Sequence, residues 1–204
     1  MAVWWWALVS FAAAAGTVGA PPCSGVVPAP YAEDARATTG TVLVVYKSEF
    51  HLGLYRDGAL VSIEGRPACF PVAMGKSPQG PKTRRDLAST PEGWYRVSSR
   101  RDVGQTSFHR GFFLDYPNGG DIDRAEALGV ITAGTAASLR TARREGRLPS
   151  QGTAMGGDIL IHGSGATPRD WTWGCVAMNN DEMDLVFPLV KTGDDVLILP
   201  WALP

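Results

Sequence analysis

The sequence has 204 residues, 45% of them hydrophobic, which is enough for one well-buried domain and too short for two of ordinary size. Its formal charge is −1, from 19 basic and 20 acidic residues that are interspersed. No basic stripe carries interleaved aromatic side chains, so nucleic acid is excluded as an expected partner. The 24 glycines and 15 prolines indicate many turns, as in a protein that is not mainly helical.

The first twenty residues form a distinct segment. No charged side chain occurs between Ala2 and Ala20, and an apolar run leads into small residues of the kind after which signal peptidases cleave. Such a stretch is also long enough to span a bilayer as an uncleaved anchor, although its alanines and glycines make it weakly apolar. We predict a signal peptide or N-terminal anchor at residues 1–20. The rest of the chain is then exported, periplasmic or associated with the cell wall, and meets a membrane only if this segment is uncleaved.

Residues 21–40 are rich in proline, alanine and small polar residues and lack apolar periodicity, so we predict a linker there. This segment contains Cys23, one of three cysteines. Export permits disulfides, and a Cys23–Cys69 bond is available if Cys175 remains a free thiol. Cys23 is alternatively a site of lipid attachment, and the sequence leaves both readings open.

The folded domain is predicted to begin near residue 41 with short strands. Residues 41–47 are β-branched and apolar, and residues 52–56 alternate. The Asp57-Gly58 pair that follows predicts a tight hairpin with a return strand at residues 59–63. Further strand-like runs, separated by turn clusters, occupy residues 69–74, 94–98 and 108–115.

The second half of the domain mixes helices with strands. Helical spacing and boundary residues predict helices at 121–128, 135–145 and 180–191. Compact apolar runs predict strands at 158–162 and 195–199. The fold class expected for residues 41–204 is therefore mainly β, as a single domain with a few peripheral helices.

Cys175 and His162 are candidates for a catalytic nucleophile and its base. His162 ends an apolar strand, and Cys175 follows in a later loop, directly after Gly174. A thiol becomes a strong nucleophile when an imidazole takes its proton, and a glycine beside it leaves room for substrate and for backbone N–H groups that hold an oxyanion. Taken singly, a cysteine or a histidine is more often a core residue. No second nearby histidine and no C-x-x-C motif completes a metal site.

The residues around this pair favour the catalytic interpretation. The segments I-H-G at 161–163 and T-W-G-C-V-A-M-N at 172–179 resemble the signature of the L,D-transpeptidase catalytic domain family (YkuD-like), which is His-Gly, a variable loop, and Ser/Thr-x-Gly-Cys-Ile/Val. Runs that look like this family's strands and its Thr-Pro-x-Gly turn occur at 43–47, 54–58, 90–95 and 193–198. The resemblance covers roughly residues 41–200, and it implies the family's β-rich fold.

The resemblance also implies roles for individual residues. Cys175 attacks the carbonyl of a meso-diaminopimelate residue in a peptidoglycan stem peptide and forms a thioester, which releases the terminal D-alanine. His162 takes the thiol proton and passes it to the leaving amine. A backbone carbonyl of Gly163 or Ser164 orients the imidazole, and the N–H groups of Gly174 and Cys175 form the oxyanion hole. Neither a metal nor a cofactor is expected.

Three further side chains have two interpretations each. Thr172 hydrogen-bonds nearby backbone or is plain loop structure. Trp171 and Trp173 face substrate or pack, and packing is expected for at least one of them. Asn180 is expected to cap the helix that follows it.

Two departures from the family pattern narrow the expected activity. Ala177 stands where many members carry arginine. Ala177, Lys82 and the segments D-W-T at 170–172 and Y-P-N at 116–118 together form a pattern that resembles one subgroup of the family. In that subgroup some members hydrolyse peptidoglycan-linked bonds. The stretch at 131–155 is longer than the family's plain connection and forms either a lid or a solvated surface helix.

Three functions are therefore expected in order. The first is acyl transfer, either a 3-3 cross-link between stem peptides or attachment of a protein to the wall. The second is hydrolysis through the same thioester, with water as the acceptor. The third is a wall-binding module that no longer catalyses.

Overall fold

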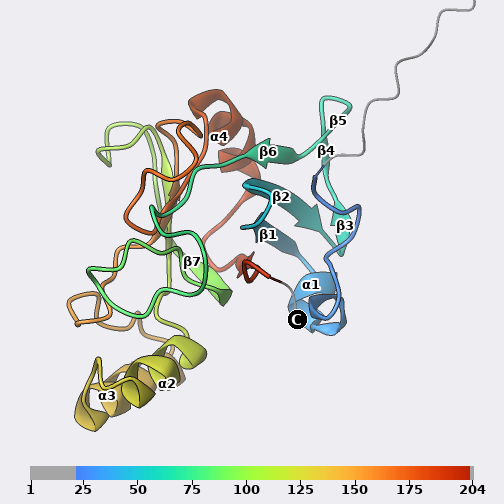
Figure 1. Cartoon of the computed structure of the whole chain (residues 1–204). Helices are drawn as coiled ribbons and strands as arrows, with labels where there is room; N and C mark the ends of the chain where they lie inside the picture. Colours follow the sequence, from blue (N-terminus) through green and yellow to red (C-terminus); the bar gives the residue numbers. More distant parts are fainter. Residues whose placement is uncertain (1–21, 203–204) are drawn as a thin grey trace, which may run out of the picture.

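The computed structural model describes residues 22–202, and its strands form one mixed sheet with a small separate ribbon (Figure 1). In spatial order the sheet contains β10 (Val176–Ala177), β9 (Leu160–His162), β8 (Gly111–Leu114), β7 (Gly93–Arg101), β11 (Asp195–Ile198), β1 (Thr41–Tyr46), β2 (His51–Arg56) and β3 (Ala59–Leu60). β6 (Cys69–Pro71) also pairs with β2, and the ribbon joins β4 (Ser62–Ile63) to β5 (Arg66–Pro67). Only the β1–β11 and β9–β10 pairings are parallel among these strands. The predicted mainly β fold with few helices is confirmed.

β1 is apolar along most of its length because both of its faces are buried. Leu43 and Val45 belong to the main core. Val42 and Val44, which alternate with them, pack in a second cluster with residues of the N-terminal segment. A strand that is covered on both sides gives a continuous apolar run in the sequence, and this run is the pattern that predicted the strand.

The prediction of a linker at residues 21–40 is wrong for the residues that the structure describes. Cys23 forms a disulfide with Cys69, and the chain continues through the short helices η1 (Tyr31–Glu33) and α1 (Ala35–Thr38) before it enters β1. The segment has no periodic apolar pattern because one covalent bond and a few isolated apolar side chains hold it on the sheet. The disulfide also means that Cys23 is not free for lipid attachment.

The predicted signal peptide or anchor at residues 1–20 lies outside the described residues. Within residues 22–202, the helices are too short or too polar to cross a bilayer.

The hairpin predicted at Asp57-Gly58 is confirmed. Both residues have positive φ, 50° and 83°, as a two-residue type I′ turn requires, and β2 pairs with β3 directly across them. The return strand predicted at 59–63 is split, however. Glu64 and Gly65, also at positive φ, make a second tight turn, which pairs the end of that run with β5 instead.

The last predicted helix is shorter than expected. It comprises α4 (Asn180–Val186) followed by one 3-10 turn, η2 (Phe187–Leu189), instead of a single helix over 180–191. Pro188 explains the break, because it has no N–H for an α-helical hydrogen bond and its ring clashes with the preceding turn.

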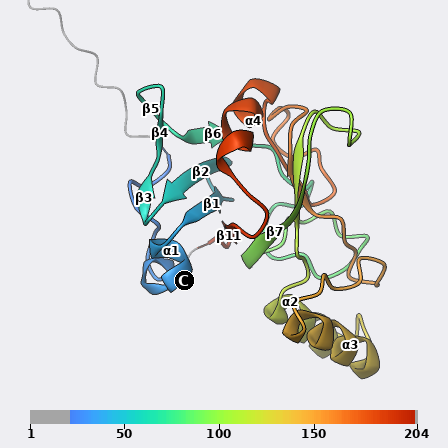
Figure 2. The ribbon, with the colours of Figure 1, turned by 180° about the vertical axis from the view of Figure 1, so that it is seen from behind.

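The helices α2 (Gly119–Ala127) and α3 (Ala133–Arg144) lie together at one end of the domain, whereas α4 lies at the other (Figures 1 and 2). α3 comes from the long stretch at 131–155. Its Leu139 is 1% exposed and belongs to the main core, so this helix is packed on the domain along one side.

Asp121, in the first turn of α2, has a buried carboxylate that contacts Tyr95 of β7. It is 1% exposed, and its Oδ2 accepts hydrogen bonds from the Tyr95 hydroxyl (2.7 Å) and the Asn118 N–H (3.0 Å). Its Oδ1 has no hydrogen-bond partner among the described residues and lies 3.7 Å from the Arg124 guanidinium. Burial raises the pKa of Asp121 to about 6, against the hydrogen bonds from Tyr95 and Asn118, which lower it.

We expect Asp121→Asn to become progressively more favourable to stability as the pH rises. The pKa in the folded state lies above the unfolded value, so the protonated carboxyl stabilises the fold below about pH 4, and this contribution is lost as the pH rises through 6. Between pH 4 and pH 8, urea unfolding should show the variant gaining about 2–3 kcal/mol relative to the parent. Asp123→Asn, at an exposed carboxylate of the same helix, is the matched control. A gain that does not vary with pH would contradict the assignment to Asp121.

Candidate active site

The parallel pairing of β9 with β10 places Cys175 and His162 on one side of the sheet. The register joins Ala177 to His162, so Cys175, just before β10, falls opposite Leu160. Side chains two residues apart point to the same face of a strand, and therefore Cys175 and His162 share a face. At ordinary strand spacings their Cα atoms are about 8 Å apart. The structure thus brings together the two residues predicted to be catalytic.

His162 is held in one orientation and one tautomer. It is 1% exposed, and its Nδ1 is hydrogen-bonded to the carbonyl oxygen of Gly163. A carbonyl only accepts hydrogen bonds, so Nδ1 carries the proton and Nε2 keeps a free lone pair. The ring stacks on Phe108, with 3.7 Å between centroids, and meets Trp171 edge-on at 5.9 Å. Burial lowers the pKa of His162, so the imidazole is neutral near pH 7 and able to accept a proton.

Cys175 is the free cysteine of the described residues, and it is partly exposed. Its thiol donates a hydrogen bond to the carbonyl oxygen of Asp158, with Sγ and O 3.6 Å apart. Burial raises the pKa of the Cys175 thiol, whereas the backbone of Leu160 and the charge of Lys82 lower it. The resting group is therefore a thiol, and a base is needed to make it a nucleophile.

Thr172 shapes the turn that carries the cysteine. Its hydroxyl donates to the carbonyl oxygen of Cys175 (2.7 Å) and accepts from the N–H of Gly174 (3.1 Å). Gly174 has a φ of +126°, and a Cβ there would lie 2.7 Å from the carbonyl oxygen of Ser89, so only glycine fits. The bond to Thr172 occupies the Gly174 N–H, so this group must be released or shared to serve in the predicted oxyanion hole.

Asn180 does not cap α4, contrary to the sequence-based expectation. Its Oδ1 accepts a hydrogen bond from the N–H of Ser164 (2.8 Å), and the neighbouring Asn179 accepts from Ala166 (3.1 Å). A Cβ at Gly163 would lie 2.7 Å from Asn180 Oδ1. The two asparagines therefore hold the loop after His162 against the start of α4, a role that local sequence does not reveal.

The two tryptophans before Cys175 lie in different environments. Trp171 packs against His162, and its Nε1 donates to the carbonyl oxygen of Gly165 (3.2 Å). Trp173 is 64% exposed, with the Lys76 ammonium 4.5 Å from its ring centroid. Trp171 thus has a packing role, whereas Trp173 presents its ring to the solvent beside the cysteine.

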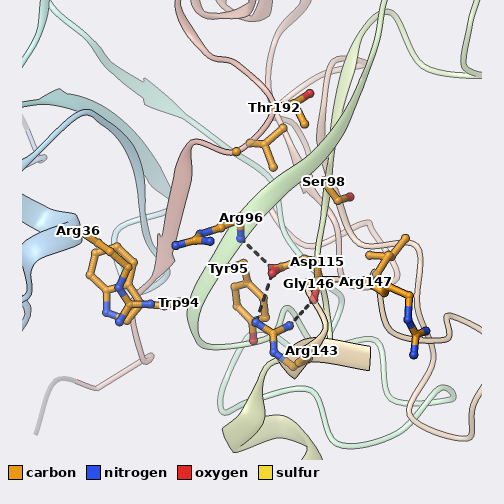
Figure 3. A pocket seen from close by; sticks show the side chains of 13 residues that line it. Arg36, Trp94, Tyr95, Arg96, Ser98, Asp115, Arg143, Gly146, Arg147 and Thr192 are labelled. Atoms are coloured by element: carbon orange, nitrogen blue, oxygen red, sulfur yellow. Dashed lines mark hydrogen bonds and ion pairs between the residues drawn. The ribbon is translucent and has the colours of Figure 1, made fainter. Parts of the chain in front are cut away.

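A separate cavity of about 500 Å³ lies along β7 and contains none of the predicted site residues (Figure 3). Four arginines line it. Each is already paired with a carboxylate: Arg36 with Asp34, Arg96 with Asp195, Arg143 with Asp115, and Arg147 with Glu145. The positive charge of the arginines that line the cavity is therefore neutralised by these carboxylates. Elsewhere within residues 22–202, no cluster of three or more histidine, cysteine or acidic side chains could hold a metal ion.

Comparison with known proteins identifies the family. The L,D-transpeptidase catalytic domain (YkuD) matches residues 40–198. No curated protein gives a significant match.

The comparison also found several similar solved structures. Pgp2 of Campylobacter jejuni (K307A mutant), described as a helical cell shape determining protein, is 18% identical with a TM-score of 0.50, over 79% of this chain and 47% of that one. An L,D-transpeptidase of Xylanimonas cellulosilytica is 18% identical with a TM-score of 0.49, over 80% and 62% of the two chains. Bd1075 of Bdellovibrio bacteriovorus is 22% identical with a TM-score of 0.46, over 81% and 50%. The chain thus spans 47–62% of the length of these structures. Since the family match covers most of the sequence, the chain belongs to the L,D-transpeptidase catalytic domain family (YkuD).

Proposed function

We propose that the protein is a cysteine-dependent peptidoglycan L,D-transpeptidase that acts on stem peptides containing meso-diaminopimelate, in cell-wall cross-linking or remodelling. The observation that carries the proposal is the state of His162. Its Nδ1 is committed to the Gly163 carbonyl, so Nε2 is the proton acceptor, on the face of the sheet that also carries Cys175. A role in cell shape, which the description of Pgp2 gives for that protein, falls within the same proposal.

The reaction follows from these positions. Nε2 of His162 takes the thiol proton, and Sγ of Cys175 attacks the carbonyl carbon of the diaminopimelate residue. The Cys175 N–H, joined by that of Gly174 once Thr172 releases it, stabilises the oxyanion. The intermediate collapses to a thioester and expels D-alanine, whose amine takes the proton from Nε2. An amine of a second stem peptide, or of a wall-attached protein, then loses a proton to Nε2 and attacks the thioester carbonyl. The new amide bond forms as the C–S bond breaks, and the Cys175 thiolate recovers the proton from Nε2.

Hydrolysis is the second candidate, with water attacking the same thioester. The observation that favours it is Ala177, which stands where many family members carry arginine. Ala177 is 0% exposed, and its N–H donates to the carbonyl oxygen of Ala73 (2.8 Å). Ala177 pairs with His162 across β10 and β9, so the position beside the proposed base carries a small neutral side chain in place of a cation.

Export is part of the proposal. Disulfides form and persist in oxidising compartments, so the Cys23–Cys69 bond supports a periplasmic or wall-associated protein. Residues 1–20 then act as a signal peptide or as an anchor, ahead of a catalytic domain at residues 41–204.

Product analysis tests the proposal and separates its two forms. The purified protein is incubated with disaccharide-tetrapeptides, and the products are resolved by mass spectrometry, with protein alkylated at Cys175 as the control. We expect cross-linked dimers together with free D-alanine. If tripeptides form without dimers, the protein is a hydrolase and the transferase proposal is wrong.

A third outcome would reject both enzymes. If neither product forms and a carbapenem leaves the intact mass of the protein unchanged, Cys175 does not act as a nucleophile. The wall-binding module would then be the remaining function.

A further inference from the structure

Lys82 is a buried amine in the loop between β6 and β7, next to Gly174. The residue is 3% exposed, and its Nζ donates to the carbonyl oxygens of Leu87 (2.8 Å) and Trp173 (3.4 Å). Both bonds are stronger when the donor is charged, so they stabilise the ammonium more than the neutral amine. Trp173 belongs to the turn that carries the cysteine, which ties Lys82 directly to that turn.

Two glycines make the space in which this side chain lies. A Cβ at Gly156 would be 3.2 Å from Cε of Lys82, and a Cβ at Gly174 would be 3.6 Å from Nζ. The amine is therefore packed against the backbone immediately before Cys175.

No carboxylate within residues 22–202 lies at salt-bridge distance from Lys82. The charge of Asp86 raises the pKa of Lys82 by less than the charge of Arg85 lowers it, and Asp86 is itself paired with Arg84 (2.9 Å). Together these two side chains therefore do not compensate the buried amine. Burial lowers the pKa of Lys82, and a thiolate at Cys175 is the charge that opposes this shift most strongly. Buried charges are ordinarily paired, which makes Cys175 the missing partner.

We propose that Lys82 supplies a fixed positive charge that stabilises the Cys175 thiolate once His162 has taken its proton. The proposal rests on Cys175 being the nucleophile assigned above. The step moves one proton from Sγ to Nε2 and leaves a thiolate between an imidazolium and an ammonium. Asp158, whose charge raises the pKa of the thiol, acts in the opposite direction, and the backbone of Leu160 acts with Lys82. Lys82 thus acts through Cys175, by stabilising its negative charge, and takes no part in the bond changes itself.

The test is the pH profile of Cys175 alkylation by iodoacetamide. Cys23 and Cys69 are bonded to each other, so Cys175 is the single free thiol of the three cysteines. Lys82→Met removes the charge at similar length, and Lys82→Gln removes the charge but keeps an N–H donor for the two carbonyls. Lys76→Met, beside Trp173 at the surface, is the matched control.

Both Lys82 variants should raise the pKa of the thiol by about one unit and slow alkylation at pH 7 by about tenfold. The Lys76 variant should leave the profile unchanged. Profiles that coincide with that of the parent would overturn the proposal, because a purely structural role leaves the thiol pKa unmoved.

A reciprocal measurement needs no change at Lys82. In protein carrying ¹³Cε-labelled lysine, Cys175→Ser should lower the pKa of Lys82, since coupling between two titrating groups acts in both directions. A Lys82 signal that is already neutral at pH 7 in the parent would refute the proposal even if the variants fail to fold. Both readouts are independent of peptidoglycan, so an absence of muropeptide products would count against the proposed function and not against this pairing.

Discussion

Replacing His162 by glutamine is expected to slow acylation of Cys175 by about 10³-fold. The glutamine amide fits the same space between Phe108 and Trp171, but it has no nitrogen that takes a proton near pH 7. The thiol, whose pKa is raised by burial, then stays protonated. The rate is measured as growth of the carbapenem adduct by intact mass, so it depends on no particular acceptor.

The same assay gives a pH dependence with a defined sign. His162 works as a base only when it is neutral, and burial places its pKa below the usual 6.5. In the parent protein, acylation should therefore decline only as the pH falls below about 6.5.

His51→Gln, an identical change at the start of β2, is the control and should acylate like the parent. If the His162→Gln variant is acylated at the parent's rate, His162 is not the base.

The largest effect on stability is expected from the Cys23–Cys69 disulfide. The bond closes a loop with a sequence separation of 46, and loop-closure entropy assigns it about 4 kcal/mol of stability. The double variant Cys23→Ser/Cys69→Ser should lose that amount in urea unfolding. It should also uncover Val42 and Val44, because the N-terminal segment would detach from their face of β1.

Cys175→Ser is the matched control, since it exchanges the same atoms without touching the disulfide. Its unfolding midpoint should fall when a reducing agent is added, whereas that of the double variant should not respond. A double variant as stable as the parent would show that the segment is held by its apolar contacts alone.

The parts of the fold that the sequence predicts are those specified locally. β1 follows from a β-branched run, and the β2–β3 turn from an Asp-Gly pair whose positive φ values few other residues tolerate. The packing of residues 22–40 is not specified in this way, since it depends on Cys69 and on the outer face of β1. β10 is missed for the same reason, because two residues, Val176 and Ala177, become a strand only by pairing with β9.

The candidate site divides along the same line. Cys175 and His162 can be predicted from sequence because the motif around them is a contiguous pattern. Asn180 is misassigned, since its position before a helix suggests a cap, whereas its side chain serves the loop after His162. Lys82 enters the sequence analysis only as part of the subgroup resemblance, with no role assigned to it, and its contact with the turn that carries Cys175 is seen only in the folded chain.

The disulfide also bears on the order in which the chain matures. Three cysteines permit three pairings, and two of these would consume the thiol that the chemistry needs. On the proposed export route, Cys23 and Cys69 are the first two cysteines to emerge, since the amino terminus leads. They are also separated by the shorter span, which costs less entropy to close. Oxidation can thus be complete before Cys175 appears. The N-terminal segment therefore has a second consequence: by pairing with Cys69, its cysteine protects the proposed nucleophile from forming a wrong disulfide during synthesis.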